Sequence, residues 1–279
     1  KKVKKSNMRI PLMHIVAPTV WAWKENRAEY ISNLYDHLLV LFPFEKDYFI
    51  KYNLKTTFIG HPIIENFSIS EKSNFSYKYI NNEKKFTISI FPGSRVGEVN
   101  RHFSVLINTI DIFIKKYPDV NIFCLAANQV KGMIKEKMRA YPNIPLDIID
   151  ESKYKNELLN STDLAIAVSG TISLELAASN TPMVVLYKFN FLSYYLVKRL
   201  VKVKYASIVN ILLNKEVIPE FIQSDASSNK IVKKLFYLYD SKIARETQKK
   251  YFKKAISLIA SNKHKPSNLA TNEIIKMLK

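Results

Sequence analysis

Runs of consecutive apolar residues alternate along this chain with stretches in which apolar residues recur at helical spacing. Unbroken apolar runs predict strands that are buried on both faces, since no position in them is left for water. These runs are TISIF (87–91), NIFCLAA (121–127), LAIAV (164–168), PMVVLY (182–187) and the weaker PLDII (145–149). Over 98–116, apolar residues recur every three or four positions and predict one buried face of a helix. The alternation predicts an α/β fold with a parallel sheet covered by helices on both faces.

A polar stretch divides the chain. Residues 68–85 (SISEKSNFSYKYINNEKK) are polar and lack periodicity, which predicts a linker. Before the linker, 1–68 predict a partial α/β unit that contains a strand at about 10–17. After it, 86–225 predict a fuller unit, and 226–279 are lysine-rich and helical in pattern. We therefore expect two Rossmann-like, doubly wound parallel-sheet domains, the N-terminal one incomplete, and then C-terminal helices.

Composition limits the classes of protein to which this chain can belong. An apolar fraction of 47% supplies a core and excludes a disordered chain. The lone Cys124 excludes a disulfide framework and a cysteine-based zinc cluster. The 43 Lys and Arg against 24 Asp and Glu give a net charge of +19, which suits either a membrane surface or a nucleic acid as partner. The lysine excess is equally consistent with a compositional bias of the source.

The strongest local signal for chemistry is FPGSRVGEV (91–99), which follows a predicted strand and opens a predicted helix. Backbone N–H groups and the positive end of the helix dipole point at an anion from such a place. Gly93 and Gly97 let the backbone turn and approach a ligand closely. Ser94 can donate a hydrogen bond, and the guanidinium of Arg95 matches phosphate oxygens. Although the spacing fits neither the P-loop nor the dinucleotide fingerprint, it favours a phosphate-binding loop over an ordinary turn.

A second loop of this kind is AVSGTISLELAAS (167–179), again at the end of a predicted strand. Ser169, Gly170 and Thr171 predict a tight turn and the start of a helix. Glu175 lies four residues after Thr171, hence on the same helix face, where its carboxylate could accept both hydroxyls of a ribose. The alternative for Glu175 is a solvated charge in the first helical turn. Two such loops at the carboxyl ends of parallel strands together predict a site for a nucleoside diphosphate.

Other candidate residues carry weaker signals. His61 in FIGHP follows a presumed strand, and Trp21 and Trp23 could line a sugar or acyl pocket, although a structural role is commoner for both residue types. Asn210 is a buried polar candidate whose role nothing in the sequence defines. The histidines show no metal-ligand spacing and no Ser/His/Asp or Cys/His arrangement. We expect no metal and no cofactor.

Seven stretches of the chain, in this order and spacing, resemble the lipid-A-disaccharide synthase family. They are APTVWAWKENR (17–27), LFPFEK (41–46), FIGHP (58–62), FPGSRVGEV (91–99), SGTISLELAASNTPMVVLYK (169–188), LVKRLVKVKYASIVN (196–210) and PEFIQ (219–223). The chain has five glycines, whereas average use predicts roughly 20 for this length. Four of them lie in these stretches, where we expect them to mark sharp turns or close approach to a ligand.

The resemblance implies a GT-B architecture, in which two Rossmann-like domains face the active site. It also implies transfer of 2,3-diacylglucosamine from UDP to the 6-hydroxyl of 2,3-diacylglucosamine 1-phosphate, with inversion, release of UDP and no metal. On this basis 1–68 belong to the acceptor-binding domain and 86–225 to the donor-binding domain. The residues that fall on the UDP-sugar site are Gly93, Ser94, Arg95, Glu98, Ser169, Gly170, Thr171, Glu175 and Asn210. Arg95 and Asn210 are the catalytic candidates, and Arg95 would neutralise charge on the departing diphosphate.

Two departures from the family pattern affect this interpretation. The family usually has proline directly before the residue that matches Asn210, where this chain has Val209. Residues 1–7 read as the tail of a helix whose start is absent, so the first βα units of the acceptor domain are expected to be missing. Those units carry the expected general base, and we therefore expect this fragment to be inactive alone.

The resemblance also implies partners. Both substrates carry acyl chains, so we expect the enzyme to be cytoplasmic and peripheral on the anionic inner-membrane surface of a Gram-negative-type bacterium. Residues 189–204 (FNFLSYYLVKRLVKVK) combine aromatic, aliphatic and basic side chains and predict the docking surface, with a buried helix as the alternative. A homodimer is a further expected assembly, and no nucleic acid is expected.

Two other classes of function stay open at this point. One is another GT-B enzyme that uses a UDP-sugar, such as the murein-precursor transferase or a UDP-sugar epimerase. FPGSRVGE (91–98) together with VWAWKENR (20–27) argues against that class. The other is a basic nucleic-acid-binding protein, which predicts exposed aromatics among basic residues and no nucleotide site.

Overall fold

The computed structural model describes residues 10–66, 85–190, 200–201, 203–261 and 264–278. The expected helix tail at 1–7, and all of the expected linker except its last residue, lie outside the described residues. Residue contacts divide the chain into two compact units. Unit 1 comprises the described residues of 1–68, 191–204 and 255–279, and unit 2 comprises those of 69–190 and 205–254.

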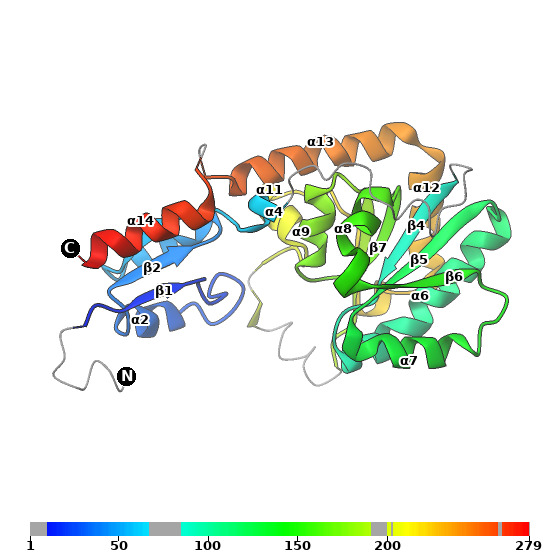
Figure 1. Cartoon of the computed structure of the whole chain (residues 1–279), viewed down its shortest axis with the longest axis horizontal. Helices are drawn as coiled ribbons and strands as arrows, with labels where there is room; N and C mark the ends of the chain where they lie inside the picture. Colours follow the sequence, from blue (N-terminus) through cyan, green and yellow to red (C-terminus); the bar gives the residue numbers. More distant parts are fainter. Residues whose placement is uncertain (1–9, 67–84, 191–199, 202, 262–263, 279) are drawn as a thin grey trace. The chain divides into compact units, whose positions relative to one another are not determined.

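Unit 2 contains a parallel sheet of six strands in the order β6-β5-β4-β7-β8-β9 (Figure 1). The strands are β4 (Phe86–Phe91), β5 (Val120–Ala126), β6 (Leu146–Asp150), β7 (Leu164–Val168), β8 (Met183–Tyr187) and β9 (Glu220–Ile222). The first five lie where the apolar runs predict them, and β4, β5, β7 and β8 are almost entirely buried. β9 has three half-buried residues, too few to produce a recognisable pattern in the sequence.

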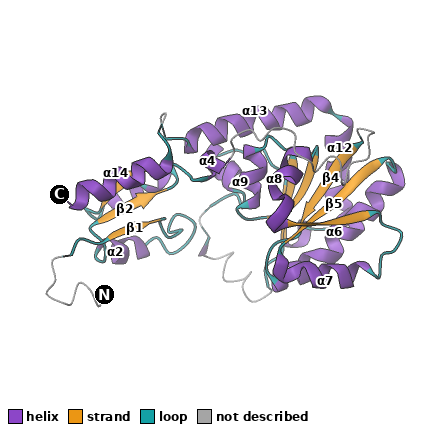
Figure 2. Ribbon diagram, viewed as in Figure 1, coloured by secondary structure: helices purple, strands orange, loops and turns teal. Residues whose placement is uncertain are grey.

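The helices of unit 2 cover both faces of this sheet (Figure 2). They are α6 (Val96–Lys116), α7 (Asn128–Met138), α8 (Glu151–Ser161), α9 (Ile172–Ala178), α11 (Ile208–Leu213), α12 (Ser228–Asp240) and most of α13 (Lys242–Ile259). In β4, Ile88 and Ile90 enter the core formed with α6 and α12. Ser89, between them, bonds to Thr162 just after α8, because alternate strand residues point to opposite faces. The predicted doubly wound parallel sheet is thereby confirmed.

Unit 1 contains a parallel sheet of three strands in the order β1-β2-β3. The strands are β1 (Met13–Ile15), β2 (His37–Val40) and β3 (Lys55–Phe58), and the helices are α2 (Arg27–Ser32), η1 (Pro43–Glu45), α3 (Asp47–Ile50), α4 (Ile63–Asn66) and α14 (Pro266–Leu278). All four residues of β2 are buried, and Leu38 and Val40 form a core with Phe49. The strand expected at about 10–17 is paired only over Met13–Ile15.

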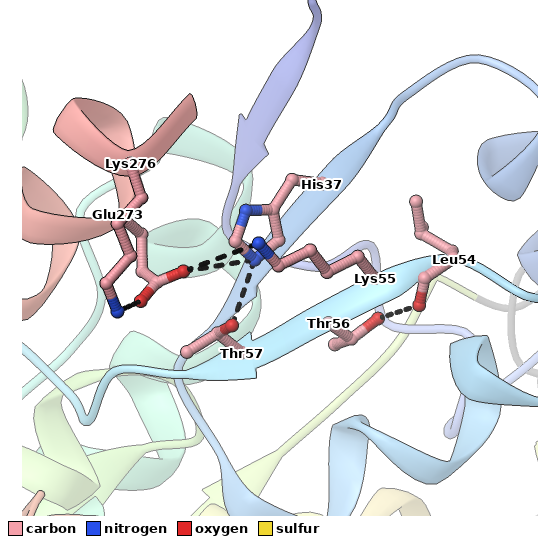
Figure 3. A network of polar contacts seen from close by, with 7 residues as sticks. All are labelled: His37, Leu54, Lys55, Thr56, Thr57, Glu273 and Lys276. Atoms are coloured by element: carbon pink, nitrogen blue, oxygen red, sulfur yellow. Dashed lines mark hydrogen bonds and ion pairs between the residues drawn. The ribbon is translucent and has the colours of Figure 1, made fainter. Parts of the chain in front are cut away.

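A polar network attaches the C-terminal helix α14 to this sheet (Figure 3). Glu273 of α14 lies 3.8 Å from Nε2 of His37 and 3.9 Å from Nζ of Lys55, and it pairs with Lys276 at 2.6 Å. Nε2 of His37 also contacts the hydroxyl of Thr57 at 2.9 Å. Burial, followed by the charge of Lys55, lowers the pKa of His37. Residues 226–279 are thus divided, since α12 lies in unit 2 and α14 in unit 1.

Candidate functional site

The predicted phosphate loop lies between the end of β4 and the start of α6, a helix of 21 residues. Gly93 has a φ of +97°, a backbone conformation that residues with a side chain rarely adopt. A Cβ atom at this position would lie 2.7 Å from Oε2 of Glu98. The turn therefore requires glycine at position 93 and brings the loop against Glu98.

Glu98 and Arg95 stabilise the start of α6 together. The carboxylate of Glu98 accepts hydrogen bonds from the backbone N–H of Arg95 at 3.4 Å and from its Nη1 at 3.0 Å. A glutamate that reaches back from the third helical position satisfies an N–H group that the helix leaves unpaired. The side chain of Glu98 is 14% exposed, whereas that of Arg95 is 81% exposed. Glu98 is therefore mainly a structural residue, and Arg95 presents a cation to solvent at the positive end of the helix.

The second predicted loop, Ser169–Gly170–Thr171, connects β7 to α9. The hydroxyl of Ser169 donates to the carbonyl of Ala206 at 3.3 Å. The carbonyl of Gly170 accepts from the hydroxyl of Ser173 at 2.8 Å. Since β7 is the neighbour of β4 in a parallel sheet, both loops follow carboxyl ends at the same edge of the sheet.

Glu175 in α9 is paired with a residue that the sequence did not single out. Nζ of Lys155, in α8, lies 2.8 Å from Oε2 of Glu175 and donates to its Oε1 at 3.0 Å. Burial acts to lower the pKa of Lys155, but Glu175 and Glu151 outweigh this effect and raise it. Lys155 therefore stays charged, and Glu175 is held by an ion pair rather than being a freely solvated carboxylate.

Asn210 lies in α11 with no exposed surface. Its Oδ1 accepts from the backbone N–H groups of Val217 and Ile218, both at 2.9 Å. Its Nδ2 donates to the carbonyl of Ile218 and to Oε1 of Glu220, both at 2.8 Å. These four bonds use the full capacity of an asparagine amide. Asn210 thus holds its own loop together, and its side chain has no hydrogen-bonding group left for a substrate in this conformation.

Glu220 in β9 organises the same region, although sequence reasoning did not select it. Its carboxylate accepts from the backbone N–H groups of Ala206 and Ser207, both at 2.7 Å, as well as from Asn210. Burial raises the pKa of Glu220, against the lowering effect of these donors. The segment before α11 is therefore attached to β9 through Glu220 and to the second loop through Ser169. Among the features noted in the sequence, only the stretch PEFIQ (219–223) includes Glu220.

His102 connects α6 to the end of β8. It has no exposed surface, its Nδ1 lies 2.7 Å from the carbonyl of Glu98, and its Nε2 lies 2.8 Å from the backbone N of Lys188. The neighbouring Arg101 donates from Nε to the carbonyl of Lys188 at 3.2 Å. Burial lowers the pKa of His102 to about 4, so Nδ1 donates and a neutral Nε2 accepts. The sequence analysis did not predict this connection, since it noted of the histidines only that they show no metal-ligand spacing.

The other weaker candidates, His61, Trp21 and Trp23, lie in unit 1. Nδ1 of His61 accepts from the backbone N–H of Ile63 at 3.1 Å, and burial lowers its pKa. Nε1 of Trp21 donates to Glu45 at 3.1 Å, and burial raises the pKa of that carboxyl. Trp23 is 37% exposed.

Cys124 is buried, and burial raises the pKa of its thiol to about 12, as expected for an unreactive cysteine. Within the part of the chain that the structure describes, no group of three His, Cys, Asp or Glu side chains could hold a metal ion. A search of the same residues finds no helix whose length and apolar character would let it cross a membrane.

Comparison with known proteins assigns the chain to a family. Residues 1–274 match the family described as lipid-A-disaccharide synthetase. The chain is 38% identical to the lipid-A-disaccharide synthase of Rickettsia conorii over 88% of its own length and 55% of the relative's. It is 35% identical to that of Rickettsia prowazekii over 99% of its own length and 72% of the relative's. The chain thus spans little more than half of the first relative and less than three quarters of the second.

A solved structure agrees with the predicted fold. The S. aureus MnaA–UDP co-structure matches 97% of this chain and 70% of that chain with a TM-score of 0.69 at 12% identity. At this identity the likeness concerns the fold alone, and it confirms the GT-B-like α/β architecture. The sequence matches, at higher identity and over nearly the whole chain, show that this chain belongs to the lipid-A-disaccharide synthase family.

Proposed function

We propose that this chain binds a UDP-sugar in unit 2 and takes part in joining two acylated glucosamine units. The donor would be UDP-2,3-diacylglucosamine and the acceptor 2,3-diacylglucosamine 1-phosphate. The sugar is transferred with inversion at the anomeric carbon and UDP leaves, without a metal or a cofactor. Membership of the family supports the reaction class, and the two loops at one edge of the sheet support the nucleotide.

The observation that carries this proposal is the loop from Gly93 to Arg95 at the start of α6. It combines a glycine turn, the unpaired N–H groups of a long helix, and an arginine that is 81% exposed. The diphosphate lies against this loop, where Ser94 and the backbone N–H groups donate to its oxygens. Arg95 stabilises the charge that develops on the diphosphate as the bond to the sugar breaks. Because the arginine is already in place, little reorganisation is needed at that moment.

The second loop holds the nucleoside part of the donor. Ser169, Gly170 and Thr171 bring backbone groups to the same sheet edge, and Glu175 accepts hydrogen bonds from the ribose hydroxyls. Nζ of Lys155 lies 2.8 Å from Oε2 of Glu175 and holds the carboxylate in a fixed position. A carboxylate has more acceptor sites than one ammonium group uses, so it can accept from the ribose hydroxyls as well. Asn210 acts as a positioning residue, since it donates to Glu220, which in turn holds the backbone of Ala206 beside Ser169.

The direct test is titration of the chain with UDP by isothermal calorimetry. We expect binding, and Arg95→Ala should weaken it about 10- to 100-fold, because a charge-assisted hydrogen bond is lost. Lys115→Ala is the matched control: it removes one positive charge from the same helix at its far end. Unchanged affinity in Arg95→Ala would remove Arg95 from the site. Absence of UDP binding together with salt-sensitive RNA binding would replace the proposal with a nucleic-acid-binding function.

The substrates also define where the protein works. We propose that it rests on the anionic cytoplasmic face of the bacterial inner membrane, because both substrates carry acyl chains. The sequence predicts that residues 189–204 form the docking surface. Most of these residues lie outside the part of the chain that the structure describes. A homodimer belongs to the same proposal, and sedimentation equilibrium measures it directly. A purely monomeric species at all concentrations would exclude the dimer.

A further inference from the structure

Arg101, in the second turn of α6, lies beside the predicted phosphate loop. Its side chain is half-buried, and its Nε donates to the carbonyl of Lys188 at 3.2 Å. Lys188 directly follows β8, at the edge of the parallel sheet where both predicted loops lie. Within the described residues, Nη1 and Nη2 of Arg101 make no hydrogen bond. The contact with Lys188 therefore fixes one side of the guanidinium and leaves its two terminal nitrogens free to donate.

Gly97 makes room for this guanidinium at the first turn of α6. A Cβ atom at Gly97 would lie 3.3 Å from Nη1 of Arg101 and 3.9 Å from its Nη2. Helical side chains lean toward the N-terminus of their helix, so Arg101 reaches back over the residue four positions before it. Gly97 is helical and has no positive φ angle. Its lack of a side chain therefore matters for the position of Arg101 rather than for a turn of the backbone.

Positive charges gather at this end of the helix. Over its first two turns α6 contains a single acidic residue, Glu98, whose carboxylate is paired with Arg95 at 3.0 Å. Burial is the main cause of the lowered pKa of His102, and the charges of Arg101 and Lys188 lower it further, so both charges lie close to that ring. The helix dipole disfavours cations at its N-terminal end. Three cations there cost stability unless an anion lies among them.

We propose that Arg101 is a second diphosphate-binding arginine, whose guanidinium fits beside Gly97 and is held by the carbonyl of Lys188. This inference rests on the proposed function, in which a UDP-sugar binds at the same loop, and it adds a residue that the sequence did not single out. Nη1 and Nη2 donate side by side to two phosphate oxygens, a geometry that a guanidinium provides and an ammonium does not. Arg95, which is 81% exposed, contacts the diphosphate from the solvent side, and Arg101 contacts it from the side of β8.

The test is a double-mutant cycle in which UDP affinity is measured by isothermal calorimetry. Arg101→Ala should weaken UDP binding about 10- to 100-fold, because a charge-assisted hydrogen bond is lost. Gly97→Ala should weaken it about twofold to tenfold, because the new methyl group displaces the guanidinium from its preferred rotamer. In the Arg101→Ala background, Gly97→Ala should have no further effect. If the two losses add instead, the methyl group acts on the loop and not through Arg101.

Controls separate charge, folding and contact. Arg139→Ala is the matched control: Arg139 is exposed directly after α7, and this variant, which loses the same charge, should bind UDP as the unsubstituted chain does. Arg101→Lys keeps the charge and the stem but lacks the paired nitrogens, so it should still bind UDP more weakly. Urea unfolding is measured on all variants, and the midpoint of Gly97→Ala should not fall, since alanine favours a helix over glycine. Uridine, which lacks the diphosphate, should bind Arg101→Ala and the unsubstituted chain equally in ligand-observed NMR.

Three outcomes would overturn the inference. Unchanged UDP affinity in Arg101→Ala would remove this residue from the site and leave the proposed function in place. Equal losses of uridine and UDP affinity in Arg101→Ala would show that Arg101 acts only by positioning the segment at Lys188. Absence of UDP binding by the unsubstituted chain would overturn both the inference and the proposed function.

Discussion

The conformation of the protein requires glycine at only some of its five glycine positions. Gly60 and Gly93 have positive φ angles, and a Cβ at Gly60 would lie 3.1 Å from the carbonyl of Ile259. A Cβ at Gly97 would meet only the flexible end of Arg101, at 3.3 Å. At Gly132 and Gly170 it would meet nothing within 4 Å. The expectation that motif glycines mark sharp turns is thus confirmed at two positions, whereas at Gly170 only a bound ligand could require glycine.

This contrast predicts that replacing glycine by alanine changes the free energy of unfolding differently in the two loops. Gly93→Ala should reduce the free energy of unfolding by about 1–3 kcal/mol, because it forces a left-handed residue against Glu98. Gly170→Ala should change it by less than about 0.5 kcal/mol. Urea unfolding followed by circular dichroism measures both. If the nucleotide passes close to Gly170, that variant loses UDP affinity while keeping its stability. Equal destabilisation by the two substitutions would contradict this account of the loops.

At the scale of elements, local pattern and long-range contact contribute differently. The strand β4, the helix α6 and the loop between them were predictable because apolar runs and helical spacing are local properties. The attachment of α6 to the end of β8 was not predictable, because it depends on a hydrogen bond between His102 and Lys188, which are 86 residues apart in the sequence. The segment from Ala206 to Glu220 likewise depends on contacts between side chains and distant backbone groups. Such contacts leave no periodic trace in the sequence.

A substitution at Asn210 tests whether that segment depends on one side chain. Asn210→Leu removes four hydrogen bonds and leaves the backbone groups of Val217 and Ile218 without their partner. We expect a loss of about 2–4 kcal/mol in the free energy of unfolding. Asn156→Leu, at an exposed position of α8, is the control and should change it by less than about 0.5 kcal/mol. A stable Asn210→Leu variant that lacks only UDP affinity would favour direct substrate contact instead.

At the scale of the whole molecule, charge and buried histidines make stability depend on pH. Burial lowers the pKa of His37, His61 and His102, so the folded protein keeps these rings neutral. The unfolded chain takes up these protons at higher pH than the folded protein does. The stabilisation from neutral histidines is therefore complete above their ordinary pKa and is lost as pH falls. Burial raises the pKa of Glu45 and of Glu220, so the folded protein takes up these two protons more readily than the unfolded chain does. These carboxyls therefore favour the folded state as pH falls, opposite to the effect of the histidines. The net charge of +19 adds self-repulsion as carboxylates protonate.

We therefore expect the free energy of unfolding to fall as pH decreases from 6.5 to about 4, with His102 contributing about 3 kcal/mol over this interval. Urea unfolding at several pH values measures the slope. His102→Gln, whose amide can still donate and accept but does not titrate there, should flatten the slope even if it lowers stability at neutral pH. An unchanged slope in this variant would show that His102 is not responsible.

The sequence by itself determined the α/β class, five strands of the larger sheet, and the two loops at its carboxyl edge. It could do so because a buried strand or a buried helix face produces a hydrophobic pattern among residues that are close together in the sequence. Only the tertiary structure decided that Glu175 pairs with Lys155, that Asn210 is fully engaged within its loop, and that Arg95 stays exposed. These outcomes depend on residues that meet through folding, so the chemistry of each side chain followed from its three-dimensional partners.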